Sequence, residues 1–303
     1  MEINISDVTK KFKNNKVLDD ISLKIKEGNT ALIVGKNGAG KTTLIRLILN
    51  LYNVTSGNIL VDNINVSSRE YDKVKEKIGF LNDNIGLFKE FTAWDNIEFF
   101  HRIYFPNATS NQRKIDIEYV LKNVDLYNNR DSKITFFSRG MKQRLAIARA
   151  IVNKPKILIL DEPSRGLDLE GKEMLKDIIQ QYQNDGATIL INSHDLDDFQ
   201  YTATQIAFIK EGKIICEGSY NDLQREFGEN IYSLKTNNNS EIKKRLQQQV
   251  FVDYVEITKD ELIIHINKSL EVLSKWLYQN NVKINELKKV NDTLSYLYKK
   301  IIG

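Results

Sequence analysis

A glycine-rich stretch of eight residues constrains this chain more than any other part of its sequence. Residues Gly35–Thr42 read G-K-N-G-A-G-K-T, after the apolar run Ala31–Val34 and before a leucine- and isoleucine-rich segment. A buried strand, a glycine-rich turn and a helix form the context in which G-x-x-x-x-G-K-[ST] binds phosphate. The glycines let backbone N–H groups converge on phosphate oxygens, and the helix N-terminus adds positive partial charge. The sequence therefore predicts a nucleoside-triphosphate site, with contacts from Gly35, Asn37, Gly38, Ala39, Gly40, Lys41, Thr42 and Thr43.

Two carboxylates at the end of another apolar run supply the chemistry that such a site needs. The run Ile157–Leu160 is followed directly by Asp161 and Glu162. Lys41 would reach the β- and γ-phosphates, whereas Thr42 and Asp161 would hold Mg²⁺. Glu162 could orient or deprotonate the water that attacks the γ-phosphate. An acidic strand end alone is often structural, but beside a phosphate loop it favours hydrolysis of ATP.

Apolar runs and amphipathic segments alternate along the first part of the chain. Continuous apolar runs at Ala31–Val34, Ile157–Leu160 and Thr188–Ile191 are typical of buried strands, and Ile21–Ile25 alternates as a half-buried strand does. Strands separated by helices indicate an α/β fold with a parallel sheet. A mostly helical subdomain is expected at about residues 85–153, with helices at Trp94–Tyr104, Gln112–Lys122 and Ser138–Val152.

Three further motifs identify a family. Phe137–Arg144 reads F-S-R-G-M-K-Q-R and resembles the signature motif of ATP-binding cassette (ABC) ATPases, usually written L-S-G-G-Q. Ser164–Asp168 resembles their D-loop, and His194 resembles their switch histidine. The order of phosphate loop, signature, Asp-Glu pair, D-loop and histidine also matches. The resemblance covers residues 1–218 and implies a P-loop NTPase of the ABC type.

The resemblance implies a dimer with shared sites. In ABC ATPases two subunits pack head to tail and sandwich two ATP molecules, so each γ-phosphate would meet Lys41 of one subunit and Ser138 with Gly140 of the other. His194 would bind the same phosphate and act in catalysis with Glu162 and Lys41, while Asp168 would tie the subunits together. Phe12 resembles the aromatic that stacks on adenine, although a phenylalanine there is equally compatible with simple packing.

Two positions depart from the family pattern. Asp83 stands where the family usually has a glutamine, and we expect it to keep contact with Mg²⁺. Arg139 replaces the first glycine of the signature, and its charge could lie near the partner's ATP or on the solvated surface. Neither departure alters Lys41, Asp161 or Glu162, so an active ATPase is expected.

The C-terminal part of the chain has a different composition and predicts a second domain at residues 219–303. The expected order is strand, helix, strand, strand, helix, strand, helix, which suits a small α+β domain of the ferredoxin-like kind. Its last strands and helices are expected at Val250–Ile257, Glu261–Ile266, Leu270–Tyr278, Val282–Leu287 and Leu294–Ile302. The extension resembles that of exporter-type ABC subunits related to those for antibiotics and bacteriocins.

Composition limits the classes of partner. The net charge is only +4, which argues against a nucleic-acid binder, and the single cysteine, Cys216, excludes internal disulfides. No run approaches the ~18 apolar residues of a spanning helix, so any membrane role must come through another subunit. The resemblance to ABC transporter subunits implies a peripheral location on the cytoplasmic face of the cell membrane.

Seven aromatic residues lie between Phe88 and Phe105, in the region where family members receive a helix of the membrane subunit. Most are expected in the core of the helical subdomain, with a minority exposed for docking. The predicted function is the ATP-hydrolysing subunit of an ABC transporter, driving a separate transmembrane permease, for export, as a homodimer or a heterodimer with a second ABC ATPase. The alternative is a soluble ABC-type ATPase switch in signalling or immunity, or on ribosomes or assembly partners.

Overall fold

The computed structural model describes residues 1–82, 86–258, 260–290 and 293–303. The chain forms two compact units, one comprising Met1–Tyr220 with Ile302 and the other Asn221–Ile301 with Gly303. Each unit has a hydrophobic core of its own. Within the described ranges, no helix combines the length and the apolar character needed to cross a membrane.

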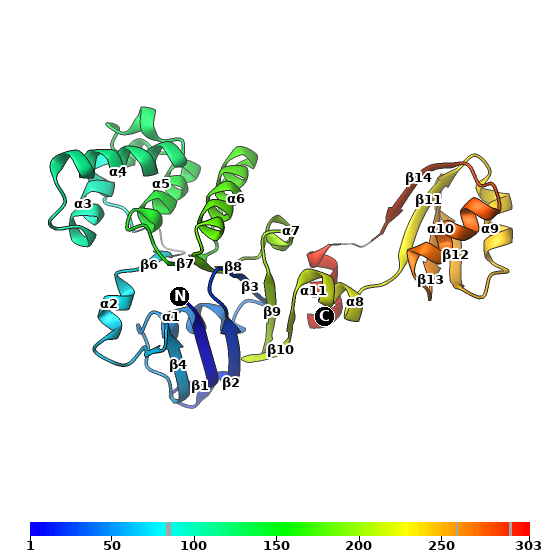
Figure 1. Cartoon of the computed structure of the whole chain (residues 1–303), viewed down its shortest axis with the longest axis horizontal. Coiled ribbons are helices and arrows are strands. Elements are labelled where there is room, and N and C mark those ends of the chain that lie inside the picture. The colour runs from blue at the N-terminus through cyan, green and yellow to red at the C-terminus, as the bar shows by residue number, and fades with distance from the viewer. Residues whose placement is uncertain (83–85, 259, 291–292) are drawn as a thin grey trace. The chain divides into compact units, whose positions relative to one another are not determined.

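A six-stranded sheet with the order β10-β9-β3-β8-β7-β6 forms the centre of the first unit (Figure 1). Neighbouring strands from β9 to β6 are parallel, and β10 is antiparallel to β9. All residues of β3, β7 and β8 are buried, as expected for strands covered on both faces, so the predicted α/β core is confirmed. The strands are β3 (Thr30–Gly35), β6 (Ile78–Leu81), β7 (Ile157–Asp161), β8 (Thr188–Asn192), β9 (Gln205–Lys210) and β10 (Lys213–Gly218).

A second, antiparallel sheet has the order β2-β1-β4-β5. Helix α1 (Lys41–Ile48) contacts β2 and β4 of this sheet as well as β3, so the segment after the phosphate loop packs between the two sheets. Of the four strands, the sequence pattern predicted only the segment Ile21–Ile25. The strands are β1 (Ile3–Phe12), β2 (Asn15–Ile25), β4 (Ser56–Val61) and β5 (Ile64–Asn65).

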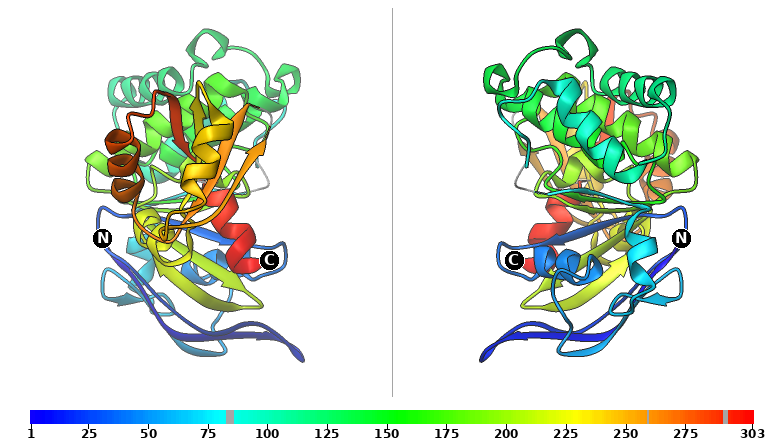
Figure 2. Two further views of the ribbon diagram at one scale, coloured as in Figure 1. Left: turned by 90° about the vertical axis from the view of Figure 1, so that its right-hand side faces the viewer. Right: turned by 90° about the vertical axis from the view of Figure 1, so that its left-hand side faces the viewer.

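Three helices form the predicted helical subdomain at the end of the first unit opposite β1 and β2, as Figure 2 shows from two sides. They are α3 (Ala93–Tyr104), α4 (Ser110–Asn123) and α5 (Arg139–Ile151). The remaining helices of this unit are α2 (Tyr71–Lys75), α6 (Leu169–Asn184) and α7 (Leu196–Phe199), with short 3₁₀ turns at Tyr127–Asn129 and Ile134–Phe136.

The expectation that most aromatic rings between Phe88 and Phe105 would form the core of this subdomain is wrong. Phe88, Phe91 and Phe99 are exposed, and the other four rings are only half-buried. Smaller side chains fill the interior instead, and α3 and α4 also bury a polar pair, in which His101 Nε2 lies 3.0 Å from Asp116 Oδ2. The buried aliphatic residues are Ala93, Ile97, Ile117, Val120 and Leu121.

The second unit contains an antiparallel sheet with the order β12-β13-β11-β14. Helices α9 and α10 supply Ile242, Leu246, Leu273, Trp276 and Leu277 to its core. The predicted order of strands and helices is confirmed, and the order of strands in the sheet is that of a ferredoxin-like domain. The elements are β11 (Ile231–Thr236), α9 (Asn239–Leu246), β12 (Val252–Thr258), β13 (Glu261–Ile266), α10 (Leu270–Gln279), β14 (Ile284–Lys289) and α11 (Leu294–Ile302), preceded by α8 (Tyr220–Phe227).

Candidate functional site

The phosphate loop joins β3 to α1 and takes a conformation that needs glycine at two points. A Cβ on Gly35 would lie 2.4 Å from the carbonyl oxygen of Ile209, on the neighbouring strand β9. Gly40 precedes α1 with a φ of 107°, and a Cβ there would lie 2.5 Å from Leu18 Cδ2. Side chains at either position would force the loop away from the sheet. The tight turn therefore leaves the loop backbone and the start of α1 open on the other side.

Lys41, the first residue of α1, lies under this loop with only 6% of its surface exposed. Its ammonium group donates hydrogen bonds to the carbonyl oxygens of Gly35, at 2.6 Å, and Lys36, at 3.2 Å. Burial lowers the pKa of Lys41, while the nearby carboxylates of Glu162 and Asp161 raise it. Two backbone carbonyl groups thus hold the lysine in place, beside two carboxylates.

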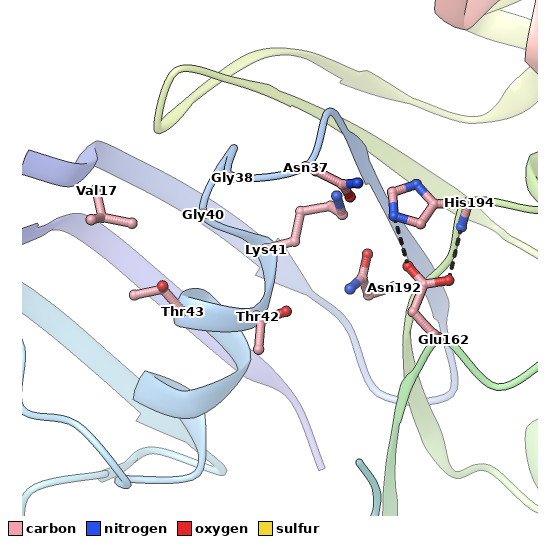
Figure 3. Close-up of a pocket in the computed structure, with 10 residues that line it drawn as sticks. All are labelled: Val17, Asn37, Gly38, Gly40, Lys41, Thr42, Thr43, Glu162, Asn192 and His194. Carbon is pink, nitrogen blue, oxygen red and sulfur yellow. Dashed lines mark hydrogen bonds and ion pairs between the residues drawn. The ribbon is translucent and has the colours of Figure 1, made fainter. Parts of the chain in front are cut away.

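Asp161 and Glu162 lie where β7 ends, next to the end of β8. Asp161 is buried and accepts a hydrogen bond of 2.5 Å from Asn192 Nδ2, and the two residues are paired in the parallel register. The Glu162 N–H donates to the carbonyl oxygen of Asn192 at 2.8 Å. Glu162 itself has a φ of 52°, a left-handed conformation that a non-glycine residue adopts at a cost of about 1–2 kcal/mol. This turn directs the Glu162 side chain toward the pocket (Figure 3).

His194 follows β8 and is paired with Glu162. Its Nε2 lies 3.2 Å from Glu162 Oε1, and its backbone N–H donates to Oε2 at 3.3 Å, as the dashed lines in Figure 3 show. Burial raises the pKa of Glu162, and the neighbouring His194 lowers it in part. A carboxylate with a raised pKa in a pocket is suited to accept a proton from water.

These side chains surround a pocket of about 380 Å³. It brings together the loop, the first turn of α1 and the ends of β7 and β8, which lie far apart in the sequence (Figure 3). The lining residues are Val17, Asn37, Gly38, Gly40, Lys41, Thr42, Thr43, Glu162, Asn192 and His194. Backbone N–H groups, a lysine and two threonine hydroxyls are the donors that a triphosphate requires, so the residues present fit ATP.

The same residues fit one Mg²⁺ ion that is bound together with a nucleotide. Thr42 and Asn192 line the pocket, and Asp161 is hydrogen-bonded to Asn192. The amide oxygen of Asn192, Oδ1, is buried without a hydrogen-bond partner in the described parts of the chain. No group of three or more His, Cys, Asp or Glu residues that could hold a metal occurs among the described residues. Mg²⁺ commonly takes one or two protein ligands plus phosphate oxygens, so such a group is unnecessary.

Some predicted residues do not line this pocket. Gly35, Ala39 and Asp161 are not among the residues that line it, and Phe12 is 40% exposed with its ring 5.2 Å from that of Tyr52. Asp83 falls outside the described residues. Adenine stacking by Phe12 and metal contact by Asp83 therefore stay predictions.

Ser138, Gly140 and Asp168 form a second cluster, at the N-termini of α5 and α6. Ser138 caps α5 by accepting a hydrogen bond from the Met141 N–H at 3.2 Å. A Cβ on Gly140 would lie 3.2 Å from the carbonyl oxygen of Gly166 in the D-loop, so the two motifs touch. None of these residues lines the nucleotide pocket of their own chain.

Asp168 caps α6 within its own chain. It accepts a hydrogen bond from the Gly171 N–H at 2.8 Å and pairs with Arg144 of α5 at 3.1 Å. The Gly171 N–H and then Arg144 hold the pKa of Asp168 below its ordinary value. The predicted contact of Asp168 with a second subunit stays a proposal.

Two residues of the site were not predicted from the sequence. Asn192 directly follows the predicted strand Thr188–Ile191, and carboxyl ends of neighbouring parallel strands meet at one edge. That rule could have identified it beside Asp161. Val17 lines the pocket from β2, and no pattern in the sequence marks it.

Comparison with known proteins finds relatives of this chain among ABC transporter proteins. The family model described as "ABC transporter" matches residues 18–165. The lantibiotic transport ATP-binding protein SrtF of Streptococcus pyogenes is 35% identical over 218 residues, which are 72% of this chain and 91% of that protein. The bacitracin transport ATP-binding protein BcrA of Bacillus licheniformis is 30% identical over 305 residues, covering 99% of this chain and 97% of that protein.

A solved structure agrees as well. The dimeric, post-hydrolysis ATP-binding cassette MJ0796, bound to ADP and Pi, is similar with a TM-score of 0.66 and 28% identity. The similarity covers 72% of this chain and 98% of that one. Fold, motifs and relatives thus agree, and the chain belongs to the ABC transporter family as an ATP-binding subunit that hydrolyses ATP.

Proposed function

We propose that this chain powers export of a compound by a separate transmembrane permease, from the cytoplasmic face of the membrane. The observation that carries the proposal is the pocket itself, where the phosphate loop and Lys41 face the Glu162–His194 pair. The names of SrtF and BcrA refer to transport of a lantibiotic and of bacitracin, which favours export of an antimicrobial peptide or similar compound. Residues 1–218 would act as the ATPase domain and residues 219–303 as an accessory domain.

The working unit is a head-to-tail dimer of two copies of this chain. The signature residues Ser138 and Gly140 do not line their own chain's pocket, so they are available for another nucleotide. Because the chain carries both the phosphate loop and the signature, two copies supply everything that two ATP sites require. The dimeric state of MJ0796 supports this arrangement.

Hydrolysis follows from the residues in the pocket. The loop N–H groups and Lys41 bind the phosphates of ATP, and Thr42 with Asp161 would hold Mg²⁺, which neutralises charge that develops on the phosphates. Asp83 would add a contact to the metal. Glu162 orients the attacking water and accepts its proton, while His194 turns from Glu162 to the γ-phosphate. Ser138 of the second copy closes the site.

ATP binding would act on the permease by closing the dimer. The γ-phosphate, which ADP lacks, contacts both chains, so ATP stabilises the closed dimer and ADP does not. Closure would move the permease to its other conformation, and hydrolysis would reset it.

The docking surface for the permease is the aromatic patch, defined here as Phe88, Phe91, Phe99 and Phe100. Phe88 and Phe99 have ring centroids 4.9 Å apart, and Phe99 and Phe100 have theirs 5.3 Å apart. The guanidinium carbon of Arg149 lies 5.3 Å from the centre of the Phe100 ring, and its NH1 donates to the carbonyl oxygen of Gly86. Exposed clustered rings of this kind suit a helix placed against them.

Affinity capture from detergent-solubilised membranes tests the proposed function. The bait is the Glu162→Gln chain with ATP and Mg²⁺, because loss of the base should keep the dimer closed. We expect recovery of a polytopic membrane protein, and a strong reduction when Phe99→Ser is added. The matched control is Phe136→Ser, since Phe136 is 80% exposed and lies outside the patch. Recovery of only soluble partners or ribosomes would contradict transport and favour the ATPase switch.

A further inference from the structure

The N-terminus of α5 carries a concentration of positive charge that nothing in the described chain neutralises. Its first turn contains Arg139 and Lys142 and no acidic residue. Neither side chain forms an ion pair with any described residue. A helix N-terminus already has positive partial charge, so cations there oppose helix formation. Conflicts of this kind with local folding rules are expected where function requires them.

Arg139 is also supported by the D-loop. Gly166 has a φ of 84°, and a Cβ at this position would lie 2.9 Å from Arg139 Nε and 3.1 Å from its Cγ. The arginine stem thus lies against the bare backbone of Gly166. Arg139 is nevertheless an exposed residue. Arg139 is the first residue of α5 and directly follows Ser138, the residue that caps this helix.

The nucleotide pocket, in contrast, requires additional positive charge. It holds one buried cation, Lys41, close to two carboxylates, Asp161 and Glu162. Binding of ATP with Mg²⁺ adds further net negative charge. No residue of α5 lines the pocket of its own chain, so a compensating cation from α5 can reach only a nucleotide held by another molecule.

We propose that Arg139 contacts the γ-phosphate of ATP bound in a second copy of this chain. The inference rests on the head-to-tail dimer of the proposed function, and it goes beyond that dimer by adding a cation where the family pattern has glycine. The guanidinium offers paired donors to two phosphate oxygens, which a glycine cannot. Because ADP lacks the γ-phosphate, Arg139 increases the preference of the dimer for ATP over ADP.

ATP-dependent dimerisation measures this role directly. The parent is the full chain with Glu162→Gln, and the dissociation constant of its dimer is measured by light scattering with ATP and Mg²⁺. We expect Arg139→Gln and Arg139→Met each to raise that constant about tenfold or more, because each loses a charge-assisted contact. Arg139→Lys keeps the charge and should retain most of the affinity. Lys114→Gln, which removes an exposed cation from α4, is the matched control and should change nothing.

Two further measurements distinguish an ionic role of Arg139 from a packing role. The weaker dimerisation of Arg139→Gln should come with a smaller dependence on salt, because an ionic contact is screened. Thermal stability of the monomer should not fall, since the substitution relieves the conflict with the helix dipole. If Arg139 only packs against the D-loop, Arg139→Gln should give a less stable monomer. Arg139→Met, which keeps the packed stem, should then dimerise as well as the parent.

The outcomes distinguish this inference from the proposed dimer. If the parent does not dimerise with ATP, the proposed head-to-tail dimer is contradicted, and so is the role of Arg139 that depends on it. If the parent dimerises and Arg139→Gln dimerises equally well, the dimer stands and the role of Arg139 alone is overturned. Retention of dimerisation by Arg139→Met would overturn it in the same way.

Discussion

His194 and Glu162 hold each other at the ATP pocket, with Nε2 of the histidine 3.2 Å from Oε1 of the glutamate. The backbone N–H of His194 contacts the other carboxylate oxygen at 3.3 Å. The pair thus links the end of β7 to the segment after β8. In the proposed mechanism, His194 exchanges the carboxylate for the γ-phosphate, which would leave Glu162 free to bind water.

The pH dependence of hydrolysis should report this pair. Burial raises the pKa of Glu162 above its ordinary value of 4.5, so the base is protonated, and activity lost, at a higher pH than for an exposed glutamate. Since His194 lowers that pKa, His194→Ala should move the acidic limb of kcat/KM to higher pH, in addition to reducing the rate. Initial rates across the pH range check this. A limb that moves to lower pH in the variant would contradict the pairing.

The geometry of the phosphate loop predicts a contrast between two glycines. Gly40→Ala combines a left-handed φ of 107° with a Cβ 2.5 Å from Leu18 Cδ2, and should lower the free energy of unfolding by about 2–4 kcal/mol. Gly28→Ala meets nothing within 4 Å at a φ of 75°, and should cost only about 1–2 kcal/mol. Urea denaturation compares the two variants. Equal losses would show that the contact with Leu18 is not tight.

The buried pair in the helical subdomain predicts a dependence of stability on Asp116. This carboxylate accepts hydrogen bonds from His101, Gln112 and Lys154, at 3.0, 3.0 and 2.8 Å. Asp116→Ala leaves a buried histidine unpaired and should lower the free energy of unfolding by about 1–3 kcal/mol. Asp131→Ala, at an exposed carboxylate, should change it by less than about 0.5 kcal/mol.

Acidification tests the same carboxylate in a second way. Although burial raises the pKa of Asp116, hydrogen bonds from Lys154, His101 and Gln112 leave it below the ordinary value of 3.8. A lowered pKa in the folded state means that its contribution is fully present above the unfolded pKa and is lost as pH falls through the folded one. The difference in stability between the parent and Asp116→Ala should therefore shrink below about pH 4. A difference that grows on acidification would contradict the assignment.

Periodicity predicted the buried parallel strands well, because β3, β7 and β8 are continuous apolar runs. The helix Leu294–Ile302 has the bounds that its pattern indicates. The antiparallel sheet was mostly missed. In β1, for example, two changes of register between Ile5 and Lys10 interrupt the alternation that would have marked a strand.

Site residues were predictable from the sequence where they belong to a motif of fixed spacing. They were not predictable where their position depends on tertiary packing. The loop motif places Lys41, and strand ends place Glu162 and His194, so the structure brings these three together. The partner of Asp161, Asn192, depends on which strands are neighbours. Exposure of Phe88 and Phe99 depends on which side chains fill the helical subdomain, which composition alone does not determine.

The central claim, that each ATP site is built from two chains, is tested most directly by mixing two inactive variants. Lys41→Met disables the phosphate loop, and Ser138→Asp keeps a good helix cap while repelling the γ-phosphate. Each variant alone should hydrolyse almost no ATP.

In a mixed dimer, one site combines both defects and the other is intact. The mixture should therefore recover up to about a quarter of the wild-type rate of phosphate release, because about half of the dimers are mixed and one of their two sites is complete. If each site belonged to a single chain, both variants would stay inactive together, and a mixture with no recovered activity would contradict the account.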